Sequence, residues 1–117
     1  MKLIANNNKV HKFFNNFDKI SKKHGIEFAK RLQKRLSELE AVQNIKELFE
    51  LKLGNPHFLK GQFDSCISIS ITGNFRLLLE TGINQKNRNV QEVEMLEEIE
   101  IKGVVDYHGN KNEWIIP

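Results

Sequence analysis

The feature that most constrains the fold is a strict alternation of apolar and polar residues at positions 66–72, which read Cys-Ile-Ser-Ile-Ser-Ile-Thr. A period of two with β-branched residues at the apolar positions predicts a strand that buries one face. Gly73-Asn74 follows as a two-residue turn signal of the Gly-first kind, and residues 75–81 continue as a second strand. These residues therefore predict a tight antiparallel hairpin.

The two-residue turn also fixes the register that we expect for this hairpin. Thr72 faces Phe75, and Ile71 faces Arg76. A further alternation begins at Ile99, continues through residue 105 and predicts a third strand that runs into Asp-Tyr-His. The polar residues 82–91 are expected to form a long loop, part of which extends the strands as an arm. The tail, residues 109–117, ends in Trp-Ile-Ile, which is apolar enough to dock on the rest of the chain.

The first half of the chain has the spacing of an α-helix. Helices are predicted over residues 8–24, 28–39 and 44–51. Asn7 or Asn8 is expected to cap the first helix, Gly25 to end it, and the turn at residues 54–56 to end the third. The first two helices should form a hairpin. Helices followed by a mostly antiparallel sheet predict an α+β fold, with N-terminal helices packed on a small sheet.

The length and composition of the chain limit the class of protein to which it can belong. A chain of 117 residues, 39% of them hydrophobic, predicts one folded domain over residues 1–117. No apolar run approaches the ~20 residues of a membrane span, and the N-terminus lacks the apolar stretch of a signal peptide. With a single cysteine, Cys66, there is no internal disulfide, and we expect a packed thiol in a cytoplasmic protein.

Charge is unevenly distributed along the chain. Residues 1–63 hold thirteen Lys or Arg against six Asp or Glu, whereas residues 64–117 hold five against nine. A basic half suits a phosphate-rich partner, although lysines also coat ordinary solvated helix faces. The candidate RNA- or ribosome-binding residues are those on the polar faces of the second predicted helix, Lys30, Arg31, Lys34 and Arg35.

The polar residues that could carry chemistry stand where predicted elements end. The sequence has no metal-binding motif and no Gly-rich phosphate loop, so no metal or cofactor is expected. Taken singly, each candidate could be loop polarity, a surface ion pair or a half-buried aromatic. The candidates are His57 and Lys60 before the hairpin, Arg76 just after its turn, and Asp106, Tyr107 and His108 at the end of the third strand.

In combination these residues resemble a known family. The matching segments, in chain order, are Pro-His-Phe-Leu-Lys at 56–60, Ser-Ile-Ser-Ile at 68–71, Phe-Arg-Leu at 75–77 and Val-Val-Asp-Tyr-His at 104–108. They are similar to the Pro-x-x-x-Lys, Ser-Ile-x-Ile, Trp-Arg-Ile/Leu and Val-x-Asp-Tyr-His elements of HigB-type toxins. These toxins are the plasmid maintenance system killer branch of the RelE superfamily of bacterial toxin–antitoxin systems.

The resemblance implies a RelE-like fold and ribosome-dependent, metal-independent cleavage of mRNA through attack of the 2′-hydroxyl. It implies a catalytic set formed by the six candidate residues named above, and a helix-turn-helix antitoxin of the HigA type as partner, beside the ribosome and mRNA. Which residue acts as general base and which as acid stays open. So do the codon preference and the oligomeric state.

The chain departs from the family pattern in three places. Ile71 is expected opposite Arg76, where the family often has a second basic residue, and Phe75 replaces Trp. Residues 82–98 and the tail are longer than in compact relatives. These departures leave an alternative: a RelE-fold protein without nuclease activity, which acts on a protein target such as DNA gyrase, as ParE-like relatives do, or only binds its antitoxin.

Overall fold

The computed structural model describes residues 1–5, 8–84, 90–108 and 111–116. The strands in these ranges are β1 (Lys2–Ala5), β2 (His57–Phe58), β3 (Cys66–Thr72), β4 (Phe75–Glu80), β5 (Glu98–His108) and β6 (Lys111–Ile116). The helices are α1 (Asn8–Phe14), α2 (Phe17–His24), α3 (Ile26–Ala41), α4 (Ile45–Glu50), the short 3₁₀ helix η1 (Gly61–Phe63) and α5 (Val90–Glu94).

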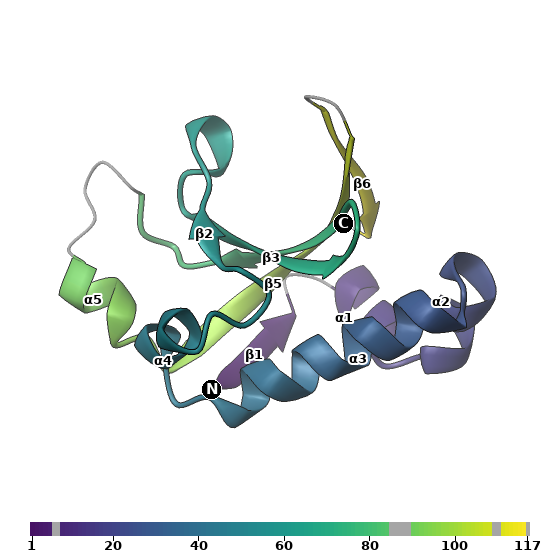
Figure 1. The fold of residues 1–117 in the computed structure, drawn as a ribbon, viewed down its shortest axis with the longest axis horizontal. Helices are drawn as coiled ribbons and strands as arrows, with labels where there is room; N and C mark the ends of the chain where they lie inside the picture. Colours follow the sequence, from purple (N-terminus) through teal and green to yellow (C-terminus); the bar gives the residue numbers. More distant parts are fainter. Residues whose placement is uncertain (6–7, 85–89, 109–110, 117) are drawn as a thin grey trace.

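These strands form one curved sheet with helices on one side of it (Figure 1). The strand order is β1-β5-β4-β3-β2, and β6 pairs with the C-terminal half of β5. Only the β1–β5 pair among these described strands is parallel. The predicted α+β class, with helices packed on a mostly antiparallel sheet, is confirmed. The predicted order is wrong at its start, because β1 precedes the helices.

The β3–β4 hairpin forms where it was predicted, but its register differs near the turn. Thr72 faces Phe75 as expected, whereas Arg76 faces Ser70 and not Ile71, because a β-bulge lies between Ser70 and Thr72. The Ile71 side chain is 3% exposed and packs in the core on the helix side of the sheet. A bulge adds one unpaired residue to a strand, which an unbroken alternation of residue types does not reveal.

The predicted helix over residues 8–24 is two helices, α1 and α2. The Asn16 side chain accepts a hydrogen bond of 3.1 Å from the Lys19 N–H and so caps α2. The Asn15 side chain donates to the His11 carbonyl oxygen, 2.9 Å away, at the end of α1. Gly25 ends α2 as predicted, at φ 96°. Asn8 is the first residue of α1, and Asn7 lies outside the described residues.

The second and third predicted helices, α3 and α4, are confirmed. α2 and α3, joined at Gly25, contact each other as the expected helical hairpin. Asn44 caps α4 through a 3.0 Å bond from the Glu47 N–H. The predicted loop at 82–91 runs into α5 at Val90, and residues 85–89 lie outside the described part of the chain. The apolar tail docks as β6 on β5.

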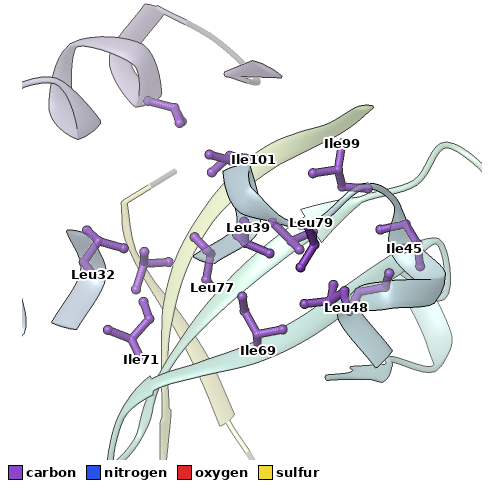
Figure 2. Close-up of a cluster of buried hydrophobic side chains, with 14 of the residues drawn as sticks. Leu32, Leu39, Ile45, Leu48, Ile69, Ile71, Leu77, Leu79, Ile99 and Ile101 are labelled. Atoms are coloured by element: carbon purple, nitrogen blue, oxygen red, sulfur yellow. The ribbon is translucent and has the colours of Figure 1, made fainter. Parts of the chain in front are cut away.

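The core lies between the sheet and the helices (Figure 2). It is built from buried aliphatic side chains, each of which contributes ~1.5–3 kcal/mol on burial. The sheet and α3 and α4 contribute, among others, Ile69, Leu77, Leu79, Ile101, Leu32, Leu39, Ile45 and Leu48. Alternate residues of β3 and β4 therefore lie on the other face of the sheet, the helix-free face, against which none of the described α-helices packs. None of the described helices has the length and hydrophobicity that a membrane span requires.

Candidate active site

A hollow of about 280 Å³ lies on the helix-free face of the sheet. Residues of four strands and one connection line it: His57, Leu59, Ser68, Arg76, Leu78, Val105 and Tyr107. Figure 1 shows α3 and α4 on the opposite side of the curved sheet. Three of the six predicted catalytic residues therefore lie in one hollow, although they come from distant parts of the sequence.

Strand pairing explains why these residues meet. His57 of β2 faces Ser68 of β3, and Ser68 faces Leu78 of β4. One row further along, Arg76 faces Val105 of β5. Side chains directly opposite each other on paired strands lie on the same face. The two rows together form the floor of the hollow.

The Arg76 guanidinium is held by carbonyl oxygens of the β3–β4 turn. Its Nη1 donates to the Gly73 carbonyl oxygen and, at 3.2 Å, to that of Phe75. The ion pairs within the described ranges involve Arg31, Arg35 and Lys102, not Arg76. Carbonyl partners position the guanidinium, and no described residue supplies a counterion for its positive charge. The arrangement suits a side chain that binds an anion.

His57 has one ring nitrogen committed and one available. Its Nδ1 lies 3.2 Å from the Asn55 carbonyl oxygen. A carbonyl oxygen only accepts hydrogen bonds, so this contact requires a proton on Nδ1, and in the neutral ring Nε2 then carries a lone pair. Asn55 holds its carbonyl there from a left-handed backbone at φ 52°. The exposed imidazole is thus oriented to accept a proton at Nε2.

Tyr107 completes the lining beside the turn. Its backbone N–H donates to the Asn74 carbonyl oxygen at 2.8 Å, which ties the end of β5 to the β3–β4 turn. Its side chain is 42% exposed. The same turn thus carries carbonyl partners for both Arg76 and Tyr107, which fixes the two residues relative to each other.

The other three predicted catalytic residues are not among those that line the hollow. Lys60 is exposed at the start of η1, next to the lining residue Leu59. Asp106 faces Phe75, whose ring contacts Phe28 of α3 on the helix side of the sheet. His108 ends β5 and its backbone pairs with Lys111, and its side chain lies outside the described part of the structure.

The four predicted RNA-binding residues lie on α3, across the sheet from the hollow. Lys30, Arg31 and Lys34 are exposed, and Arg31 lies 4.0 Å from the carboxylate of Glu27. Arg35 has a different environment. Its Nε donates to the Ser70 carbonyl oxygen at 2.7 Å and its Nη1 to Glu38 at 2.8 Å. The first bond attaches α3 to the bulged part of β3, and the second, within α3, holds the guanidinium in place.

Sequence reasoning missed the polar floor of the hollow. Ser68 is 3% exposed and lies between His57 and Leu78. The alternation that predicted β3 also placed Ser68 and Ser70 on one face of the strand. These two small hydroxyl side chains on a strand with apolar neighbours were the sequence signal that could have indicated polar residues in the floor of the hollow. Since the bulge brings Ser70 opposite Arg76, Ile71 has no part in the hollow.

Cys66 is a packed thiol, as predicted. Its side chain is 0% exposed, and its Sγ lies 3.6 Å from Glu80. Burial, followed by the nearby Glu80 carboxylate, raises the pKa of Cys66 to about 11. The described residues contain no group of three His, Cys, Asp or Glu side chains that could hold a metal ion.

Comparisons with known proteins find a distant structural likeness. No family model matches the chain, and neither does any curated protein. A solved structure described as the YoeB/ParE toxin from Agrobacterium tumefaciens is similar at 17% identity and a TM-score of 0.49, covering 93% of this chain and 100% of that chain. A structural likeness at this level does not assign a function. The basis for a functional proposal is the geometry of the hollow together with the sequence motifs.

Proposed function

We propose that this chain is a single-domain toxin of a toxin–antitoxin system, of the HigB type in the RelE superfamily, that cleaves ribosome-bound mRNA without a metal ion. An antitoxin with a helix-turn-helix domain, of the HigA type, holds it inactive in the cytoplasm. The observation that carries the proposal is the convergence of His57, Arg76 and Tyr107 in one hollow. They belong to three of the four motifs on which the family resemblance rests.

The chemistry of RNA cleavage matches these side chains. The 2′-oxygen attacks the adjacent phosphorus as its proton passes to a base, and the 5′-oxygen leaves with a proton from an acid. The products are a 2′,3′-cyclic phosphate and a 5′-hydroxyl. His57 Nε2 serves as the base, because its Nδ1 is oriented toward Asn55. The Arg76 guanidinium, which has no carboxylate partner among the described residues, stabilises the charge on the non-bridging oxygens.

The remaining members of the predicted set have supporting roles. Tyr107, half open to solvent in the hollow, orients the nucleotide. Lys60 is an exposed cation next to Leu59, which lines the hollow, and it attracts the phosphate backbone of the RNA. Asp106 and His108 complete the set by family resemblance, with His108 as the candidate acid.

Expression without an antitoxin tests the function. We expect growth arrest, and primer extension on an induced message should detect new 5′ ends inside the coding region. The matched control is the same message without its start codon, which should stay intact because cleavage requires translation. Intact message during arrest would contradict the nuclease function and favour the alternative toxin, whose action on gyrase is measured as loss of plasmid supercoiling.

The nucleophile has its own test. A message with a single 2′-deoxynucleotide at the main cleavage position should not be cut there by the purified protein on ribosomes, because the attacking oxygen is missing. Unchanged cleavage at that position would mean that water, and not the 2′-oxygen, attacks the phosphorus.

A further inference from the structure

Of the Phe, Tyr and Trp side chains whose exposure the structure describes, two are exposed, and both lie on the helix-free face of the sheet. Tyr107 is 42% exposed and Trp114 is 40% exposed. The rings of Phe28 and Phe75, and those of Phe49 and Phe58, instead pack against each other. Ligand sites are lined mainly by apolar and aromatic side chains, so a large ring left open beside a candidate active site is a candidate ligand contact.

Trp114 continues the row of residues that contains Arg76. On β5, Val105 faces Arg76 on one side and Trp114 of β6 on the other. Neighbouring strands are ~4.8 Å apart, so the backbones of Arg76 and Trp114 are about 10 Å apart on the same face. This spacing suits one phosphate and the base of an adjacent nucleotide.

Phe63 of η1 fixes the position of the indole. The centroids of the two rings are 5.8 Å apart, with their planes at 76°. An edge-to-face contact covers at most one face of the Trp114 ring and leaves the other open for stacking. The Lys102 ammonium lies 5.8 Å from the centre of the Phe63 ring and 3.4 Å from Glu80. Its charge is therefore already balanced by a carboxylate, and Arg76, which has no ion pair among the described residues, is the candidate for the phosphate.

We propose that Trp114, positioned by Phe63, is a stacking subsite for a nucleobase of single-stranded RNA next to the scissile phosphate. The inference rests on the proposed ribonuclease function for the identity of its ligand. Every nucleobase presents a π-face, so this subsite adds affinity and orientation with little dependence on base identity. It also gives a role to the tail, which the family motifs do not cover.

The test removes the Trp114 ring and the RNA base, separately and together. Single-turnover cleavage of ribosome-bound mRNA is measured for wild type and Trp114→Leu, each with a normal message and with one that is abasic at the nucleotide adjoining the cleavage site. Loss of one stacking contact should reduce kcat/KM roughly 5- to 150-fold. The abasic message should cause a similar loss with wild type and little further loss with Trp114→Leu.

Two variants keep the result interpretable. Trp114→Phe retains an aromatic face and should recover most of the activity, and Leu51→Ala removes an exposed apolar side chain at the far end of α4 as a matched control. Thermal melting establishes that each variant is folded. If Trp114→Leu melts below the assay temperature, the comparison of Trp114→Phe with wild type on both messages decides, since a stacked ring of either kind must make cleavage sensitive to the missing base.

The outcomes separate the two proposals. If wild type cleaves the message and folded Trp114→Leu cleaves equally well, or if the two losses simply multiply, the stacking subsite is wrong and the nuclease function stands. If wild type does not cleave ribosome-bound RNA at all, both proposals are wrong.

Discussion

The single cysteine shows how its surroundings control the reactivity of one residue. With the pKa of Cys66 raised to about 11 by burial and by Glu80, its thiolate fraction at pH 8 is ~100-fold below that of an unshifted thiol. We expect iodoacetamide to label the native protein at least ~100-fold more slowly than the urea-unfolded protein, as followed by mass spectrometry. Equal rates would mean that the thiol is not enclosed by β3 and β4.

Glu80 provides a pH-dependent contribution to stability. Burial by itself raises the pKa of Glu80, but hydrogen bonds from Ser65 and the Gly82 N–H, together with Lys102, outweigh it and lower the pKa. A carboxyl whose folded pKa is lowered stabilises the protein above its unfolded pKa of ~4.3, and this stability is lost as the pH falls through the folded value.

Glu80→Gln should therefore destabilise the protein at pH 7 by on the order of 1 kcal/mol, with a difference that shrinks below pH ~4. Urea unfolding of both proteins at pH 7 and pH 3 measures this. Glu50→Gln, at an exposed position of α4, is the control and should change little at either pH. A difference that grows toward low pH would contradict the direction of the pKa shift.

At the scale of elements, the contact between α3 and β3 depends on Arg35. Its Nε bond to the Ser70 carbonyl and its Nη1 bond to Glu38 are partly buried. Ser70 in turn donates its N–H to the Gly54 carbonyl at 2.8 Å, in the turn that leads to His57. Arg35 therefore supports the connection that carries one side of the hollow.

Arg35→Gln should lower the free energy of unfolding by ~1–3 kcal/mol, because the Ser70 carbonyl loses a charged donor. Lys34→Gln, one residue away on the solvent face of α3, should change it by less than ~0.5 kcal/mol. Urea denaturation of the two variants side by side is the measurement. Equally small effects of the two substitutions would mean that Arg35 contributes no more to stability than its exposed neighbours on α3.

Elements with a strong local pattern were predictable from the sequence, and others were not. β3 and α3 each have a clear period and β4 follows a two-residue turn signal, and the positions of all three were predicted closely. β1 has only four residues, and its partner strand begins at Glu98, so nothing local marks the pairing. The break at Asn15–Asn16 was hidden because α1 and α2 both contribute to the same core, which keeps the apolar spacing running across the break.

For the molecule as a whole, the sheet separates two surfaces of different chemistry. The hollow lies on the helix-free face, and the exposed cations belong to α3, which Figure 1 shows on the other side of the sheet. Motifs in the sequence predicted His57, Arg76 and Tyr107 as site residues. Which residues lie close together in space depends on the strand order, and a local sequence pattern does not reveal the strand order. For this reason the predicted catalytic set included Lys60 and Asp106, which do not line the hollow.

If the α3 surface contacts ribosomal RNA, its affinity depends on salt. Replacing Lys30, Arg31 and Lys34 together with Gln, and keeping Arg35 because it is structural, should reduce the slope of log affinity against log salt by up to about 2–3. Ribosome pelleting over a series of salt concentrations measures it. An unchanged slope would show that these residues are an ordinary solvated helix face.

The central claim is that Arg76 stabilises the charge of the transition state in the hollow. Single-turnover cleavage of ribosome-bound mRNA by Arg76→Ala tests it directly, with Lys22→Ala on α2 as the control and melting curves to establish folding. We predict a rate about 100- to 1,000-fold below wild type for Arg76→Ala and no change for Lys22→Ala. A folded Arg76→Ala protein that cleaves at the wild-type rate would contradict the claim.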